Sequence, residues 1–100
     1  MNATRPLTDK LGRVTSTTGA QCAMDTAEVN PYALLQRHIS GDWGNVSDAN
    51  WDSNNAATLN GSRILSSYTL DTGVEIWIIT DAERAPGQRY ATTFLLPSEY

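Results

Sequence analysis

Residues 74–79 read Val-Glu-Ile-Trp-Ile-Ile, and this short apolar run decides the fold of the chain. β-Branched and aromatic residues favour an extended strand. Residues 71–73, Asp-Thr-Gly, precede the run and are typical of a turn. Residues 64–70, before that turn, contain Ile, Leu, Tyr and Leu, which mark another strand. The pattern predicts a β-hairpin between residues 64–70 and residues 74–79.

One further strand and two helices are predicted around this hairpin. Residues 89–96 alternate between two faces and stop at a proline. Asn30 followed by Pro31 is typical of a helix start, and Ser47 is placed to cap a second helix that ends at residues 60–61, Asn-Gly. The expected fold class is therefore α+β, with two short helices packed on a small antiparallel sheet of about three strands.

The first part of the chain lacks such a pattern. Residues 1–28 are rich in Thr, Ser and Ala, and their few large apolar residues show no sustained period. A segment of this kind cannot offset the entropy cost of ordering, so residues 1–28 are expected to form a flexible or loosely docked N-terminal arm. Residues 29–100 are expected to form the domain. One core of about 70 residues has a small net stability, which is compatible with a monomer or a homodimer.

The charge balance limits the class of partner. Residues 41–100 contain eight carboxylates and three arginines, a local net charge of −5 in a chain whose total is −4. Such a surface repels phosphate backbones and attracts basic proteins, so we expect a protein partner with a basic surface and no direct contact with nucleic acid. No apolar run approaches the ~20 residues of a membrane span, and no signal peptide is recognised, so the expected location is the cytoplasm.

The candidates for catalysis are few. His38 is the sole histidine, and its helix-face position is compatible with a general acid or base or with a half-buried, hydrogen-bonded structural role. Arg84 and Arg89 flank a Pro-Gly turn, where they could grip a phosphate or carboxylate or pair with Asp81 and Glu83. There is no complete catalytic set and no Cys/His cluster, so neither a cofactor nor a metal is expected.

Six residues are candidates for a partner-binding surface. A tryptophan between glycines and beside an acid has the composition of an interface hot spot, although it could equally pack at the corner between the two helices. The acids could equally be solvated side chains that keep the chain soluble. The six candidates are Asp42, Trp43, Asp48, Asp52, Asp81 and Glu83.

Several blocks of this sequence resemble a family of small uncharacterised proteins carried on bacterial plasmids, phages and integrated elements. The blocks are residues 34–44 (Leu-Leu-Gln-Arg-His-Ile-Ser-Gly-Asp-Trp-Gly), 63–68 (Arg-Ile-Leu-Ser-Ser-Tyr), 76–84 (Ile-Trp-Ile-Ile-Thr-Asp-Ala-Glu-Arg) and 92–100 (Thr-Thr-Phe-Leu-Leu-Pro-Ser-Glu-Tyr). The resemblance covers most of residues 33–100. Residues 85–90 look like an insertion relative to the family, and residues 1–30 lie outside the resemblance.

The resemblance implies a mobile element in a bacterial host cell. Such elements encode small acidic proteins that disarm host defence, notably anti-CRISPR proteins. By analogy, the expected function is a non-enzymatic DNA mimic that binds the basic nucleic-acid groove of a type I CRISPR effector (Cascade) and blocks target DNA binding. The alternative is a small ribonuclease toxin like barnase, colicin or RelE, in which His38, Arg84, Arg89 and Thr92 or Thr93 would line the RNA-cleaving face. The shortage of basic residues disfavours this alternative.

Overall fold

The predicted hairpin lies at the centre of the structure. In the computed structural model, which describes residue 7 and residues 10–100, β2 (Ile64–Thr69) pairs antiparallel with β3 (Glu75–Thr80). Their register places Ser66 opposite Ile78. β6 (Ala91–Leu95) pairs antiparallel with the other edge of β3, as the sequence pattern predicted for the third strand. The prediction of an α+β fold is confirmed.

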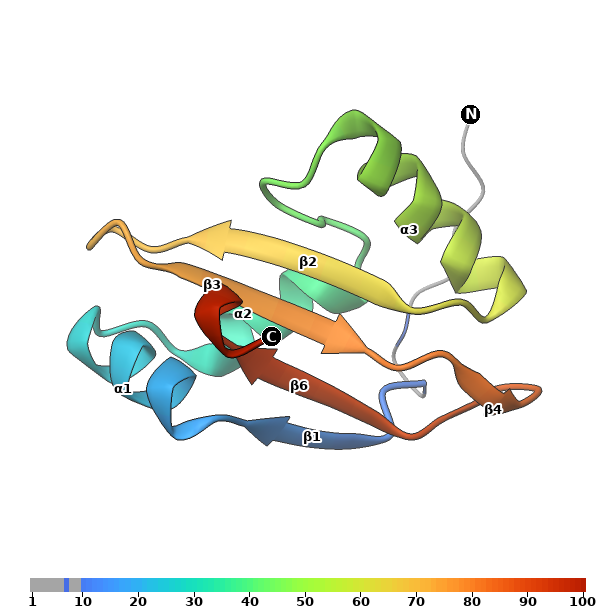
Figure 1. Cartoon of the computed structure of the whole chain (residues 1–100), viewed down its shortest axis with the longest axis horizontal. Helices are drawn as coiled ribbons and strands as arrows, with labels where there is room; N and C mark the ends of the chain where they lie inside the picture. The colour runs from blue at the N-terminus through green and yellow to red at the C-terminus, as the bar shows by residue number, and fades with distance from the viewer. Residues whose placement is uncertain (1–6, 8–9) are drawn as a thin grey trace.

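A fourth strand makes the sheet mixed rather than antiparallel. β1 (Arg13–Ser16) pairs parallel with β6, so that the strand order is β1-β6-β3-β2. Figure 1 shows the four strands side by side, with β1 at one edge and β2 at the other. The parallel pair brings the start of the described chain next to its end.

Three α-helices lie in the described part of the chain. They are α1 (Thr18–Thr26), α2 (Pro31–Ile39) and α3 (Asp48–Asn60). The side chains of Asn30 and Ser47 cap α2 and α3, as predicted. Gly61 ends α3 in the left-handed conformation, which also confirms the predicted end. α2 lies behind the sheet in Figure 1, whereas α3 runs beside β2.

Side chains along each strand alternate between the two faces of the sheet, and one of these faces meets the helices. The positions on this face are buried, and the β2–β3 and β3–β6 registers align them across the sheet. Apolar side chains of α1 and α2, together with Trp43, complete the main core. The buried strand positions on this face are Ile64, Ser66 and Tyr68 of β2, Ile76, Ile78 and Thr80 of β3, and Thr92 and Phe94 of β6.

The described residues before position 29 differ from the expected loose arm. Residues 13–16 form β1 and residues 18–26 form α1, and Met24 is completely buried in the main core. Leu7 is also buried, and its N–H donates to the carbonyl of Ile39 at 3.1 Å. The sequence pattern missed these elements because their ordering depends on the pairing of β1 with β6 and on burial of Met24 in the main core, and not on a local apolar period. Residues 1–6 and 8–9, also assigned to the arm, lie outside the described residues.

The segment expected to be a plain connection after β3 is a second hairpin. β4 (Glu83–Ala85) and β5 (Gln88–Arg89) pair antiparallel around the Pro-Gly turn. This short hairpin projects from one end of the main sheet in Figure 1. It hydrogen-bonds to the end of α3 through the N–H of Glu83, which donates to the carbonyl of Gly61 at 2.7 Å.

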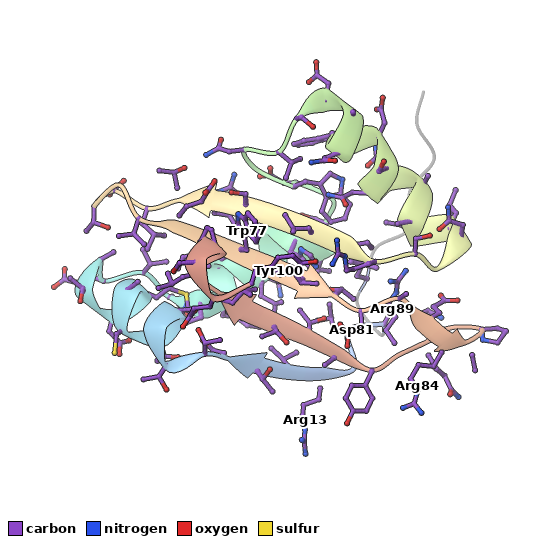
Figure 2. The ribbon with its side chains drawn as sticks, in the orientation of Figure 1. Arg13, Trp77, Asp81, Arg84, Arg89 and Tyr100 are labelled. Atoms are coloured by element: carbon purple, nitrogen blue, oxygen red, sulfur yellow. The ribbon has the colours of Figure 1, made fainter. Side chains whose placement is uncertain are left out.

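The C-terminal segment covers part of the opposite face of the sheet. The 3-10 helix η1 (Pro97–Glu99) turns the chain back, and Tyr100 makes an edge-to-face contact with Trp77 at 5.6 Å between ring centroids. Figure 2 shows both aromatic side chains in front of the sheet. Ile79 and Leu95 are buried on this face, apart from the main core. The two faces of the sheet therefore carry separate apolar clusters.

The free edge of β2 is closed without another strand. Asn54 on α3 donates to the carbonyl of Leu65 at 2.7 Å and accepts from its N–H at 3.2 Å. Two residues along, the N–H of Ser67 donates to Trp43, and its carbonyl accepts from Asn45. Unpaired edge groups invite association with other strands, so these bonds protect the edge and place α3 and residues 43–45 against it.

Met24→Ala is expected to lower the free energy of unfolding by about 2–5 kcal/mol, because it leaves a cavity where α1 meets the core. Urea denaturation followed by circular dichroism measures the change. Cys22→Ala is the matched control, since Cys22 is exposed on the same helix. Equal stability of the two variants would mean that α1 is not part of the cooperative core.

Candidate functional site

His38 lies in a buried chain of hydrogen bonds. Its Nδ1 is 2.5 Å from Oγ of Ser66 on β2, and its Nε2 is 2.7 Å from Oγ1 of Thr80 on β3. Oγ1 of Thr80 is 2.8 Å from Oγ1 of Thr92 on β6, and the hydroxyl of Thr92 donates to the carbonyl of Leu11 at 2.8 Å. The chain therefore joins α2, three strands and the segment before β1.

The direction of each hydrogen bond in this chain follows from the bond at its end, between Thr92 and Leu11. The hydroxyl proton of Thr92 is used on the carbonyl of Leu11, so Thr80 must donate to Thr92. Thr80 then accepts the Nε2 proton of His38, and Nδ1 of the neutral ring accepts the proton of Ser66. His38 is thus a neutral imidazole with Nε2 protonated, and both of its nitrogens are satisfied.

Burial makes His38 a poor proton carrier at neutral pH. Desolvation, with a smaller effect from the charge of Arg89, lowers the pKa of His38 from 6.5 to about 3. The side chain is fully buried. Of the two roles predicted for His38, the structure places it in the hydrogen-bonded structural one. Arg89 is buried, Arg84 is exposed, and Thr92 and Thr93 point to opposite faces of β6. The residues of the ribonuclease alternative therefore share no exposed face.

Trp43 belongs to the core and not to the surface. It is 0% exposed, its Nε1 donates to Oδ1 of Asn55 at 2.9 Å, and its ring packs edge-on against His38. Of the two alternatives predicted for Trp43, packing at the corner between α2 and α3 is the one observed. Gly44 allows this turn, because a Cβ there would lie 2.0 Å from the carbonyl oxygen of Ser67.

Asp42 does not present a free negative charge. Its carboxylate accepts from Nε of Arg37 at 2.7 Å, in the one ion pair found in residue 7 and residues 10–100. The hydrogen bond from Arg37 is the main cause that lowers the pKa of Asp42. Nearly half of each side chain is exposed, so the pair is expected to contribute at most about 1 kcal/mol.

Asp48 and Asp52 form the one pair of candidate acids that share an open surface. They lie one turn apart on α3, and both are exposed. Asp48 is in the first turn, where the helix dipole favours a negative charge. Ala49, Ser53 and Ala56, also exposed, are small, so a partner could approach this half of the helix closely. We call Asp48, Asp52 and these three residues the α3 acidic surface.

Asp81 and Glu83 lie at the other end of α3. Glu83 hydrogen-bonds through its backbone to Gly61, which follows the last residue of the helix. Thirteen residues of α-helix at a rise of about 1.5 Å separate the two ends by about 20 Å. Glu83 also acts electrostatically on buried Arg89. The six predicted partner-binding residues therefore do not form one patch.

Arg89 binds main-chain carbonyls rather than the neighbouring carboxylates. Its Nη1 donates to the carbonyls of Ser62 at 2.7 Å and Asp81 at 2.9 Å, and its Nη2 donates to that of Ala57 at 2.9 Å. Desolvation lowers the pKa of its guanidinium, and Glu83 opposes this. The sequence-predicted pairing of the two arginines with Asp81 and Glu83 is therefore wrong. Arg84 instead lies over the ring of Tyr90, at 5.3 Å from its centroid.

Two buried asparagines were missed by the sequence patterns. Asn54 closes the edge of β2 and Asn55 holds Trp43, yet both lie in a polar stretch that predicts a solvated helix face. Their spacing of three and four residues from Trp51 places them on the same face of the helix as that residue. A pattern that counts only apolar residues as buried does not detect this face.

No group of three or more His, Cys, Asp or Glu side chains in the described part of the chain could hold a metal ion. No helix that the structure describes is long and apolar enough to cross a membrane.

Comparisons of the chain with models of known protein families, with curated proteins and with solved structures found no match.

Acidification is expected to destabilise the protein through His38. The unfolded state, with a pKa of 6.5, binds the proton before the folded state, with a pKa of about 3. The contribution of neutral His38 to the free energy of unfolding is therefore present in full above pH 6.5. It decreases as the pH falls toward 3, by up to about 1.4 kcal/mol per pH unit. Urea denaturation should show a loss of roughly 2 kcal/mol between about pH 7.5 and about pH 5. In His38→Gln this dependence should be largely lost, and an unchanged dependence would contradict the assignment.

Arg89→Lys is expected to lower the free energy of unfolding by about 1–3 kcal/mol, because one ammonium cannot satisfy carbonyls from three segments in the geometry of a guanidinium. Thermal denaturation at constant pH measures the effect. Arg84→Lys, an exposed change in the same hairpin, should leave the midpoint unchanged. A similar midpoint for both variants would show that the three hydrogen bonds contribute no net stability.

Proposed function

We propose that this chain is a non-enzymatic inhibitor from a mobile element, acting in the cytoplasm of a bacterial host, and that it binds a basic surface of a protein partner. The observation that supports this most directly is the α3 acidic surface. Asp48 and Asp52 are exposed, and neither forms an ion pair with a described residue. Two unneutralised carboxylates on a rigid helix are suited to a cationic surface, where they steer association and set the orientation of binding.

The proposed partner is a CRISPR effector of type I, such as the Cascade surveillance complex. Its nucleic-acid groove must be basic to hold a polynucleotide, and a fixed carboxylate surface competes for the same lysines and arginines. The choice of partner comes from the resemblance to proteins of mobile elements and from the net charge of −4. Because Asp42 is paired with Arg37 and Trp43 is buried, the proposed contact is confined to the α3 acidic surface.

The ribonuclease alternative has less support. It requires His38 to exchange protons with an RNA substrate, whereas His38 is enclosed between α2 and the sheet with both nitrogens hydrogen-bonded. RNA cleavage by the purified chain that is lost in His38→Gln would overturn the proposal.

The proposal is tested with purified Cascade and labelled target DNA. Increasing concentrations of the chain should block DNA binding, and added salt should weaken the block because exposed charges are screened. The double variant Asp48→Lys, Asp52→Lys should need at least about a tenfold higher concentration to block DNA binding to the same extent.

The control is the double variant Asp25→Lys, Asp71→Lys, which changes the net charge equally at exposed positions outside α3. It should inhibit like the unmodified chain. If both double variants lose inhibition equally, net charge rather than the α3 acidic surface is responsible. If the unmodified chain leaves DNA binding intact at saturation, the proposed partner is wrong.

A further inference from the structure

The edge of the sheet at β1 is open, in contrast to the edge at β2. One side of β1 pairs with β6, and no described segment pairs with its other side. Figure 1 shows β1 as the outermost strand, with no described segment beyond it. All residues of β1 are exposed. An open edge of this kind is a template for pairing with another strand.

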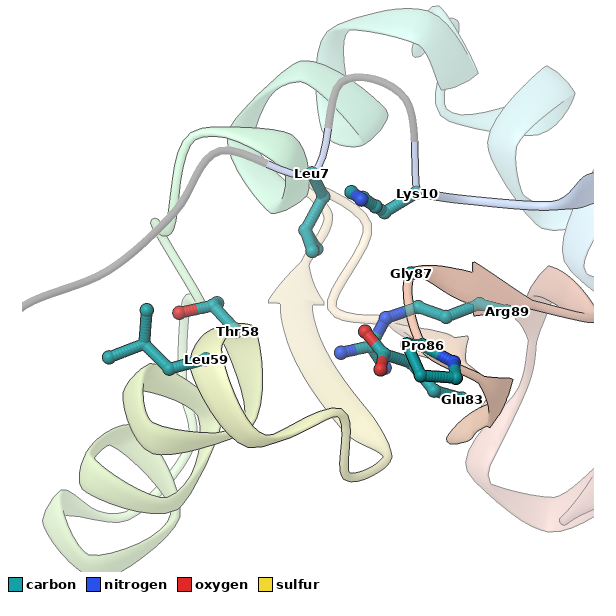
Figure 3. A pocket seen from close by; sticks show the side chains of 8 residues that line it. All are labelled: Leu7, Lys10, Thr58, Leu59, Glu83, Pro86, Gly87 and Arg89. Carbon is teal, nitrogen blue, oxygen red and sulfur yellow. The ribbon is translucent and has the colours of Figure 1, made fainter.

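The usual means of protecting a sheet edge are missing at β1. Proteins protect such edges with lysine, proline, a bulge or a covering segment. β1 reads Arg-Val-Thr-Ser, and its register with β6 runs without a shift. Lys10, the sole lysine of the chain, lies instead at the turn of the β4–β5 hairpin (Figure 3), where a Cβ on Gly87 would come within 2.9 Å of its Nζ. The edge is therefore available to a second strand.

The backbone groups of Val14 and Ser16 point away from the sheet. The N–H groups of Arg13 and Thr17 donate to carbonyls of the β6 segment, at 3.1 and 2.9 Å. Backbone groups of alternate residues in a strand point toward the same neighbour, so the odd-numbered residues of this segment face β6. The N–H and carbonyl groups of Val14 and Ser16 thus face outward, where another strand can bind them.

A second copy of β1 supplies the complementary groups. In an antiparallel pair centred on Thr15, Val14 of one copy lies opposite Ser16 of the other, and the two residues exchange N–H···O=C bonds. The two-fold axis repeats this pair, so every outward backbone group of both residues is bonded. On the same face of the joined sheet, the two Val14 side chains lie diagonally across the axis, and each is 45% exposed in the single chain.

The same register brings opposite charges together. It places Arg13 of one copy opposite Thr17 of the other. The hydroxyl of Thr17 donates to Oε1 of Glu99 at 2.7 Å, which fixes that exposed carboxylate beside residue 17. Arg13 shares the face of Thr17, has no ion pair within the described residues, and points away from the sheet in Figure 2. Each Arg13 would therefore face the partner's Glu99.

We infer that the chain forms a homodimer by antiparallel pairing of two β1 edges, which joins the two sheets into one. The strand is short and each chain carries a net charge of −4, so the dissociation constant is expected between about 1 μM and about 1 mM. The inference does not depend on the proposed function. Because α3 lies beside β2, at the other edge of the sheet, both α3 acidic surfaces stay free in the dimer.

The test measures the mass of the full chain by sedimentation equilibrium at concentrations from about 10 μM to about 2 mM. The mass should rise from 10.9 kDa toward twice this value. Over the same range, hydrogen exchange of the Val14 and Ser16 amides should slow, because they become bonded across the dimer. The amides of Arg13 and Thr17, already bonded within one chain, should change little.

An exchange of charges tests the register. Arg13→Glu should weaken the homodimer at least about tenfold, because it places two carboxylates at each contact between residues 13 and 99, and Glu99→Arg should do the same with two guanidinium groups. An equimolar mixture of the two variants should dimerise again, since each contact then joins opposite charges. Arg84→Glu is the control, with the same change of net charge at an exposed position outside β1, and it should dimerise like the unmodified chain.

Three outcomes would overturn the inference. The mass stays at 10.9 kDa up to about 2 mM, in which case the β1 edge does not accept a second copy. Alternatively, the chain dimerises while the Val14 and Ser16 amides exchange as fast as in the dilute chain, which places the interface elsewhere. Finally, the mixture of Arg13→Glu and Glu99→Arg dimerises no better than either variant alone, so that residues 13 and 99 do not meet.

Discussion

The hydrogen-bond chain through His38 is the constraint on which the rest of the structure depends. It connects α2 to β2, β3 and β6, and it ends on the carbonyl of Leu11, just before β1. A buried polar group is tolerated only when it is satisfied, so each of these elements must be in place for the others to be stable. The neutral imidazole with one donor and one acceptor nitrogen fits this arrangement, whereas an imidazolium would have to displace the proton of Ser66. This requirement makes His38 a structural residue.

The second constraint is the closure of the sheet edge by α3. An asparagine side chain carries a donor and an acceptor with the spacing of a peptide group, so Asn54 can replace a neighbouring strand at Leu65. The Trp43 segment does the same at Ser67 with its own backbone. Trp43 is thereby enclosed between His38 and Asn55, which couples the edge of the sheet to the polar chain in the core.

The two ends of α3 have opposite electrostatic character, in agreement with the helix dipole. Asp48 lies at the N-terminal end, and the guanidinium of Arg89 binds the carbonyl of Ala57 near the C-terminal end. The carboxylates of Asp48 and Asp52 are exposed, whereas the guanidinium of Arg89 is buried.

The sequence by itself determined the features that depend on neighbours within a few residues: the central hairpin, the caps at Asn30 and Ser47, and the end of α3 at Gly61. Only the tertiary structure decided the order of residues before position 29, because β1 is stabilised by a strand far away in sequence, as in the contact of Thr15 with Thr93. The same holds for the candidate sites. Trp43 is buried against His38 and Asn55, and Arg89 is buried among carbonyls of three segments. Such burial depends on where distant segments meet, and residue type alone does not predict it.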